Sequence, residues 1–158
     1  AVTLSPFLGL DSLEPWMKYD GKGLFLLCRT SNPGGSDLQE QRLASGDLLY
    51  EHVARLAQGP WNRGGQLGLV VGATFPAELE RVRTLAPTLP LLIPGVGVQG
   101  CDAAATVRAA WRREGGRTTG PIVVSSSRAV LYAGAGPDFA AAARKVARAT
   151  RDALNVAR

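Results

Sequence analysis

The sequence predicts an α/β protein built from repeated βα units, and three observations lead to this class. Short apolar runs recur along the 158 residues, each almost continuously hydrophobic. A segment with helical spacing of apolar residues follows each run, as in βαβ proteins with a parallel sheet. The repeat is roughly 30 residues, the size of one unit of a (β/α)₈ barrel. Two architectures stay open on this pattern: five of the eight units of such a barrel, or a doubly wound sheet of five strands.

The predicted strands lie at residues 1–7, 23–28, 66–73, 89–98 and 121–127. A strand with one face in water would alternate apolar and polar residues, whereas runs such as GLFLLC and QLGLVVGA do not. Continuous runs are typical of parallel strands that are covered on both faces or that line a barrel.

The first helices are predicted from caps and apolar spacing. Ser12 is expected to cap a short helix after the first strand. The next helix is expected over residues 46–58, where a Gly-Pro pair ends it. Its apolar stripe should consist of Leu49, Val53 and Leu56.

The later helices show similar signals. A helix over residues 74–87 has a proline in its first turn and should bury Leu79. Asp102 should cap a helix that runs through AAATVRAAWRR, with Trp111 facing inward, until a Gly-Gly pair ends it. Asp138 should cap the last helix.

The formal net charge is +5, and much of it lies near the end of the chain. The basic residues there are Arg144, Lys145, Arg148, Arg151 and Arg158. A basic helix can bind nucleic acid. We prefer a solvated helix face, because no aromatic residues alternate with these cations to stack on bases. We therefore predict no nucleic-acid partner. The absence of an apolar run of about 18 residues predicts no membrane-spanning helix.

Metal and nucleophile signals are weak. Cys28 and Cys101 lack the spacing of metal ligands, and His52 is the sole histidine, so we predict no metal site. His52 lies in a helical segment, which argues against a catalytic triad. A buried or half-buried thiol is the expected state of each cysteine.

Polar, Gly-rich segments follow three of the strands, at RTSNPGGSD (29–37), PGVGVQG (94–100) and SSSRAV (125–130). Both architectures bind ligands beyond the carboxyl ends of their strands. Bare glycine backbone, Gln99 and the guanidinium of Arg128 together favour a phosphate. The alternative is that the glycines only form a tight turn and Arg128 pairs with a surface acid. Similarly, Ser31 and Asn32 either form a turn or offer donors to a heterocycle.

The segments LLCRTSNPGGSD, IPGVGVQGCD and IVVSSSRAVLYA, in this order and at these separations, resemble the orotidine 5′-monophosphate decarboxylases. LSPFLGLDSLEPW and GLVVGATFPAEL have counterparts in the bacterial second subfamily. The resemblance implies a (β/α)₈ TIM barrel, with residues 1–158 as the C-terminal portion of a single domain, strands four to eight. It also implies conversion of orotidine 5′-phosphate to uridine 5′-phosphate and carbon dioxide without metal or organic cofactor. A cytoplasmic homodimer is the expected complete form.

Site residues follow from the same resemblance. Ser31 matches the serine that binds the amide edge of the pyrimidine. Gln99 matches the glutamine that spans pyrimidine and phosphate, in a closing loop that Pro94 opens. Arg128 matches the arginine that binds the phosphate, and Ser127 stands where a backbone N–H reaches the same phosphate.

The sequence departs from the family in one respect. The family's chemistry depends on alternating Lys and Asp groups, mostly in a D-x-K-x-x-D motif, and no such motif occurs here. The segment YDGKG (19–23) does not match it. We therefore expect no catalytic residue in this chain, a fragment whose first three strands precede Ala1, and no activity of the segment alone. A related sugar-phosphate enzyme and a basic RNA-binding module remain the alternatives.

Overall fold

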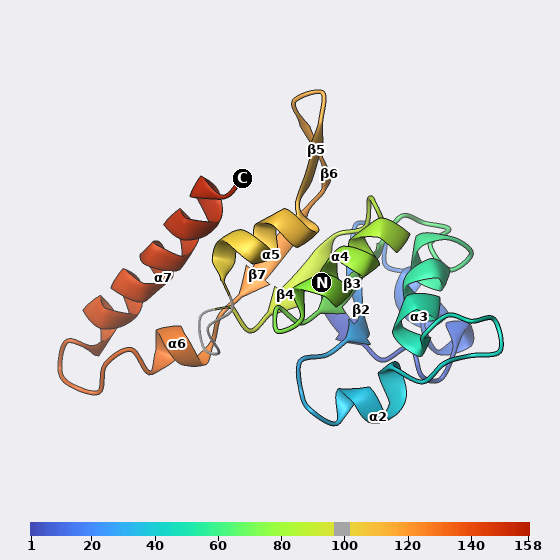
Figure 1. Cartoon of the computed structure of the whole chain (residues 1–158), viewed down its shortest axis with the longest axis horizontal. Helices are drawn as coiled ribbons and strands as arrows, with labels where there is room; N and C mark the ends of the chain where they lie inside the picture. Colours follow the sequence, from blue (N-terminus) through green and yellow to red (C-terminus); the bar gives the residue numbers. More distant parts are fainter. Residues whose placement is uncertain (97–101) are drawn as a thin grey trace.

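The computed structural model describes residues 1–96 and 102–158 and contains a parallel sheet of five strands (Figure 1). The strands of this sheet are β1 (Val2–Leu4), β2 (Leu24–Arg29), β3 (Leu67–Val71), β4 (Leu91–Pro94) and β7 (Ile122–Ser125). Each lies within its predicted run or one residue beyond it, so the five predicted strands are confirmed.

Helices occupy the connections between the strands. They are the 3₁₀ turn η1 (Leu10–Ser12), α1 (Glu14–Met17), α2 (Gly35–Gln39), α3 (Leu49–Gln58), α4 (Pro76–Leu85), α5 (Ala103–Ala110), α6 (Arg128–Leu131) and α7 (Phe139–Val156). No helix of the described residues is both long and apolar enough to cross a membrane.

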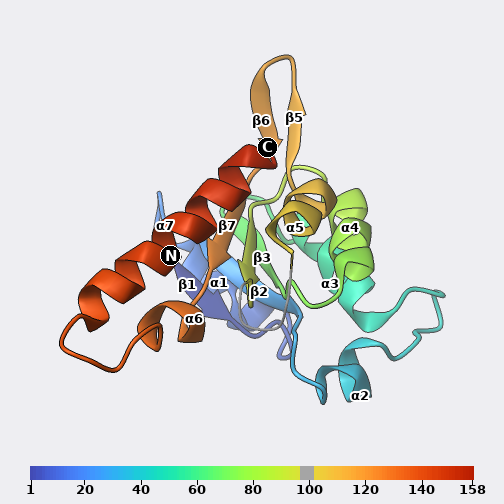
Figure 2. The same ribbon diagram turned by 60° about the vertical axis from the view of Figure 1, so that its left-hand side comes forward.

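The strand order separates the two architectures that the sequence left open. The order is β1-β2-β3-β4-β7, so each strand pairs in parallel with the next parallel strand along the chain. A doubly wound sheet reverses its order at a switch point and carries helices on both faces. Here α3, α4 and α5 lie along the same face (Figure 2). The doubly wound alternative is therefore wrong, and the sheet is an open part of a (β/α)₈ barrel.

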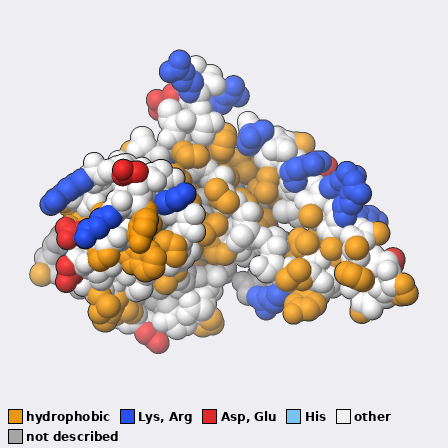
Figure 3. Space-filling view, turned by 180° about the vertical axis from the view of Figure 1, so that it is seen from behind, with side chains coloured by type: hydrophobic (Ala, Val, Ile, Leu, Met, Phe, Trp, Pro, Cys, Tyr) orange, Lys and Arg blue, Asp and Glu red, His pale blue; other side chains and the backbone are white. Residues whose placement is uncertain are grey.

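The two faces of the sheet differ in burial. Leu26, Leu69 and Ile93 point toward the helices and have no exposed surface. On the opposite face, Leu27 is 37% exposed and Val123 is 52% exposed. That face would line the interior of a closed barrel, where side chains from other strands cover it. Seen from behind, the molecule has hydrophobic side chains exposed across its middle (Figure 3).

The fourth predicted helix is shorter than expected, because α5 ends at Ala110. Trp111 already has extended backbone angles and so does not lie on a helix face. The following residues form an antiparallel hairpin of β5 (Arg112–Glu114) and β6 (Arg117–Gly120). Gly115 and Gly116 have φ of +53° and +79°, as a tight hairpin turn requires. The Gly-Gly pair is therefore a hairpin turn and not a helix end.

A buried arginine is hydrogen-bonded to the last residue of α5. Arg83 is 1% exposed and its Nε donates to the carbonyl oxygen of Ala110 at 2.6 Å. Its two terminal nitrogens donate to four further carbonyl oxygens at 2.8–3.2 Å, those of Ala86, Pro87, Leu89 and Pro121. Burial, and then the nearby Arg112, lower the pKa of Arg83 to about 10. The side chain joins the end of α4, the end of α5 and the start of β7.

Two of the predicted caps need correction. Ser12 lies inside η1, where its hydroxyl donates to the carbonyl oxygen of Gly9 at 2.7 Å, so it does not cap the helix that follows. Asp138 precedes α7 but makes no side-chain hydrogen bond to it. The cap at Asp102 is confirmed, because its carboxylate accepts the N–H of Ala104 at 2.8 Å.

The buried face of α3 differs from the predicted stripe. Val53 is buried as expected, whereas Leu49 and Leu56 are only half-buried. The buried positions also include Tyr50 and the two alanines 54 and 57. Both alanines have no exposed surface, so the buried face of α3 includes small residues that the apolar stripe of the sequence did not single out. In α4, Leu79 is fully buried as predicted.

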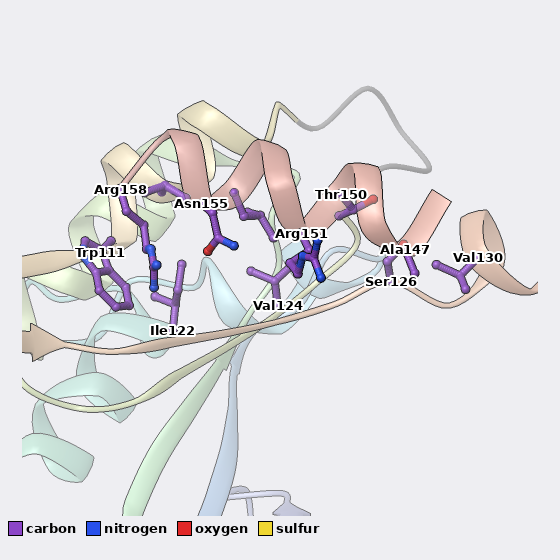
Figure 4. A pocket seen from close by; sticks show the side chains of 12 residues that line it. Trp111, Ile122, Val124, Ser126, Val130, Ala147, Thr150, Arg151, Asn155 and Arg158 are labelled. Carbon is purple, nitrogen blue, oxygen red and sulfur yellow. The ribbon is translucent and has the colours of Figure 1, made fainter. Parts of the chain in front are cut away.

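The last helix packs loosely. None of the α7 residues is buried, and its partners are α5 and α6. A hollow of about 380 Å³ lies between α7 and β7, with Ile122, Val124 and Trp111 among its lining residues (Figure 4). Arg158 lies 5.4 Å from the centre of the Trp111 ring. Basic side chains cover α7 and the β5–β6 hairpin (Figure 3).

Candidate functional site

A hollow of about 200 Å³ lies at the carboxyl ends of the strands. Its lining residues are Ser31, Pro94, Gly95, Val96, Ser125, Ser126, Ser127 and Arg128. It therefore collects four of the five residues predicted to bind substrate: Ser31, Pro94, Ser127 and Arg128. The fifth, Gln99, lies outside the described residues, as does Cys101.

Strand β4 contributes a turn at its carboxyl end. Pro94 is the last residue of β4 and pairs with Ser125 of β7. Gly95 follows with φ of +99°, and its N–H donates to the carbonyl oxygen of Ser125 at 3.3 Å. A side chain at Gly95 would meet no atom of residues 1–96 or 102–158 within 4 Å, and the positive φ is the observed reason that favours glycine there. The positive φ favours glycine at this position, and Gly95 leaves its backbone bare at the hollow.

The segment after β7 contributes the donors that an anion needs. The carbonyl oxygen of Ser127 accepts the N–H groups of Val130 and Leu131 at 3.1 and 2.8 Å, which starts α6. Within residues 1–96 and 102–158, the N–H of Ser127 has no recorded acceptor. The side chain of Arg128 is exposed and forms no hydrogen bond or ion pair with any described residue. The alternative in which Arg128 pairs with a surface acid is therefore not supported.

Ser126 is a lining residue that the sequence analysis did not single out. Its hydroxyl is buried and has no partner among the residues described. It lines both this hollow and the larger hollow beneath α7. The run of three serines was the available signal, but serine runs are common in loops, and only the structure shows which hydroxyl is enclosed.

Ser31 reaches the hollow from the end of β2 by packing against bare backbone. A Cβ at Gly72 would lie 2.8 Å from the Cβ of Ser31 and 3.0 Å from its backbone nitrogen. Real side chains do not approach so closely, so glycine at the end of β3 makes room for Ser31. The N–H of Gly72 also donates to the carbonyl oxygen of Arg29 at 2.8 Å, which fixes the two strand ends together.

In the loop after β2, Asn32 and Ser31 differ in their hydrogen bonding, which bears on whether each forms a turn or is available to a ligand. The side-chain oxygen of Asn32 accepts from the hydroxyl of Thr30 at 2.6 Å, and its carbonyl accepts the N–H of Gly35 at 3.0 Å. Asn32 therefore forms the turn. The Ser31 hydroxyl makes no hydrogen bond with the described residues, which leaves it available to a ligand.

Cys28 lies below this face but is not a nucleophile. It is 3% exposed, and its Sγ donates to the carbonyl oxygen of Tyr50 at 3.2 Å. Burial raises its pKa to about 12, with a smaller opposing effect of the nearby Arg29. The thiol thus stays neutral near pH 7, and the prediction of a buried thiol is confirmed at this position. The described residues include no group of three or more His, Cys, Asp or Glu side chains that could hold a metal ion.

Comparison with protein families identifies the chain. The profile of the "Orotidine 5'-phosphate decarboxylase / HUMPS family" matches residues 1–146. The chain belongs to this family. Two curated relatives named orotidine 5'-phosphate decarboxylase, from Albidiferax ferrireducens and Paracidovorax citrulli, are 71% and 74% identical to it over the whole chain. The chain spans only 58% and 57% of the lengths of these two family members.

Solved structures agree on the fold. A structure of Leishmania donovani OMP decarboxylase has a TM-score of 0.78 and 40% identity, and the alignment covers 97% of this chain and 56% of that one. Leishmania donovani UMP synthase gives 0.79 and 43%, over 96% of this chain and 32% of that one. The resemblance to the orotidine 5′-monophosphate decarboxylase family and the partial (β/α)₈ barrel are thereby confirmed. The individual roles of the site residues stay predictions.

Proposed function

We propose that the protein to which these residues belong converts orotidine 5′-phosphate to uridine 5′-phosphate and carbon dioxide in pyrimidine nucleotide synthesis. The observation that carries the proposal is the hollow at the carboxyl ends of the strands. It gathers the Ser31 hydroxyl, the Ser127 N–H and the Arg128 guanidinium from segments far apart in the sequence, and none of the three has a partner among the described residues. The family relatives that share about 70% of the sequence carry the decarboxylase name, which supports this substrate.

In this proposal the hollow binds the two ends of the nucleotide. Arg128 and the N–H of Ser127 bind the phosphate, because a fixed guanidinium and a free amide both donate to phosphate oxygens. Ser31 donates to or accepts from the amide edge of the pyrimidine. Pro94 opens the closing loop, and Gln99, outside the described residues, spans base and phosphate.

The chemistry requires groups that these residues do not provide. Loss of carbon dioxide leaves a carbanion on the pyrimidine ring, which a fixed ammonium stabilises and then protonates. No D-x-K-x-x-D motif occurs in the 158 residues. We assign the Lys–Asp groups to a part of the protein outside them. Phosphate binding, remote from the reacting carbon, then supplies binding energy that holds the ring in place.

The remaining features of the proposal follow from the family resemblance. The complete protein is a single barrel domain that forms a homodimer in the cytoplasm and needs neither metal nor organic cofactor. It has no nucleic-acid partner.

The experiment uses the complete protein. Loss of the orotate absorbance on incubation with orotidine 5′-phosphate measures decarboxylation, and titration calorimetry compares uridine 5′-phosphate with ribulose 5-phosphate. We expect turnover and tighter binding of uridine 5′-phosphate. Preference for ribulose 5-phosphate without decarboxylation would favour the sugar-phosphate alternative. Binding of RNA that ignores the base and falls steeply with salt would favour the RNA-binding module.

A further inference from the structure

Arg29 is a buried cation directly before the loop that carries Ser31. It is the last residue of β2 and is 1% exposed. A guanidinium is costly to bury unless its donors are paired. Its Nη1 and Nη2 are paired, whereas its Nε has no partner among the described residues. The partners of Nη1 and Nη2 therefore show what the side chain holds in place.

The guanidinium encloses Thr30, the residue between Arg29 and Ser31. Its Nη1 donates to the carbonyl oxygen of Thr30 at 2.9 Å and to Oε1 of Gln39 at 3.4 Å, and its Nη2 forms an ion pair with Glu40. Gln39 completes the enclosure. Its Oε1 accepts the N–H of Thr30 at 2.9 Å, and its Nε2 donates to the Thr30 hydroxyl at 2.8 Å.

Gly35 allows α2 to close over this network. A Cβ at Gly35 would lie 2.9 Å from Nη1 of Arg29, 3.0 Å from the hydroxyl of Thr30 and 3.1 Å from Oε1 of Gln39. The buried glycine therefore leaves room for three polar groups to meet. A side chain at this position would require the polar ends of Arg29, Thr30 and Gln39 to shift from their present contacts.

The same guanidinium also contacts the neighbouring strand connection. It lies 4.6 Å from the centre of the Phe75 ring, a cation–π contact at the start of α4. Gly72, at the end of β3, packs directly against Ser31. Ser31 is thus held between the β3 end on one side and the Arg29–Gln39 network on the other.

We propose that Arg29 is a positioning residue for the nucleobase end of the site. Through Thr30, Gln39 and Phe75 it fixes where the Ser31 hydroxyl lies at the rim of the hollow. The phosphate end is built on β4 and on the segment after β7, and Arg29 forms no hydrogen bond or ion pair with the described residues of either. This inference rests on the proposed function, in which Ser31 binds the pyrimidine.

The test is an Arg29→Met variant of the complete protein. Methionine keeps apolar bulk and removes the charge, so no unpaired cation stays buried, and the Glu40 side chain, 39% exposed, can be hydrated. We expect affinity for uridine 5′-phosphate to fall about 3- to 10-fold, as for loss of one neutral hydrogen bond. Affinity for ribose 5-phosphate, which lacks the base, should change less than about twofold. Arg55→Met, at an exposed arginine of α3, is the matched control and should change neither affinity.

A double variant distinguishes positioning from general destabilisation. If Arg29 acts through Ser31, adding Arg29→Met to Ser31→Ala should cause no further loss of affinity for uridine 5′-phosphate. Additive losses, or equal losses for both ligands, would overturn the inference. If near-ultraviolet circular dichroism shows that Arg29→Met is unfolded, Gln39→Met replaces it, and unchanged nucleotide affinity there would also overturn it. Failure of the wild-type protein to bind uridine 5′-phosphate is a separate result, which refutes the proposed function itself.

Discussion

Replacement of Arg128 by alanine tests the phosphate end of the site in the complete protein. The guanidinium is exposed and has no partner among the described residues, so its removal breaks no internal contact. The melting temperature should therefore stay unchanged. Any effect on catalysis must then come from contact with the ligand or from the lost positive charge.

The magnitude follows from the number of hydrogen bonds lost. A hydrogen bond to a charged group contributes about 1.5–3 kcal/mol. Since about 1.36 kcal/mol corresponds to a factor of ten in rate, loss of one such bond should lower kcat/KM roughly 10- to 150-fold. We expect the lower part of that range if the phosphate stays in contact with water. Orotidine, which lacks the phosphate, should lose less than about twofold.

The assay measures kcat/KM for orotidine 5′-phosphate and the dissociation constant of phosphate-free orotidine, each with wild type and Arg128→Ala. Arg148→Ala is the control, because it removes the same charge from an exposed position on α7. Equal losses for the phosphorylated and the phosphate-free compound would show that Arg128 does not bind phosphate. An equal effect of Arg148→Ala would show that only the net charge matters.

Three further predictions address chemistry, stability and the buried thiol. A polypeptide of these 158 residues alone should show no decarboxylation, and measurable turnover would contradict this. The same polypeptide should associate in sedimentation experiments, because the edges of β1 and β7 and one apolar face of the sheet are uncovered. A single sharp monomer boundary would contradict the second prediction. In the complete protein, Arg83→Met should lower the free energy of unfolding by at least about 1–3 kcal/mol, because buried carbonyl oxygens lose their donor, whereas the exposed Arg117→Met should change it by less than about 0.5 kcal/mol in the same denaturant titration. In a Cys101→Ser background, Cys28 should resist a thiol reagent at pH 8 until the protein unfolds. Folding raises the pKa of Cys28 from 9.0 to about 12. Between these two values only the unfolded chain ionises at this thiol, so the free energy of unfolding should fall by about 1.4 kcal/mol per pH unit above pH 9. A Cys28→Val variant with the same slope would contradict this.

The strands of the sheet could be predicted because continuous apolar runs are typical of parallel strands that are covered on both faces. Every strand of the parallel sheet lies within one residue of its run. The β5–β6 hairpin was missed, because its residues RRE and RTTG carry none of the apolar periodicity on which strand prediction depends. The Gly-Gly pair does not distinguish a helix end from a hairpin turn, because both accept glycine with positive φ.

The site was predictable only in part. Placing Ser31 and Arg128 in one hollow follows from the rule that carboxyl ends of parallel strands meet at one edge. The two buried arginines were not predictable, because nothing in the sequence distinguishes Arg29 and Arg83 from exposed arginines. Their burial depends on carbonyl and side-chain oxygens that the fold brings from distant segments. The role of Gly35 likewise appears only when its contacts are known.

The curvature of the sheet connects the two ends of the proposed site. Ser31 follows β2 and Arg128 follows β7, with β3 and β4 between them in the sheet. Neighbouring strands lie about 4.8 Å apart, so the two strands would be roughly 14 Å apart in a flat sheet. Both residues nevertheless line a single hollow of about 200 Å³. The sheet must therefore curl so that its carboxyl ends converge, as strands do around the mouth of a barrel. In the proposed function, this convergence lets Ser31 and Arg128 contact the base and the phosphate of one ligand, although their strands are not neighbours in the sheet.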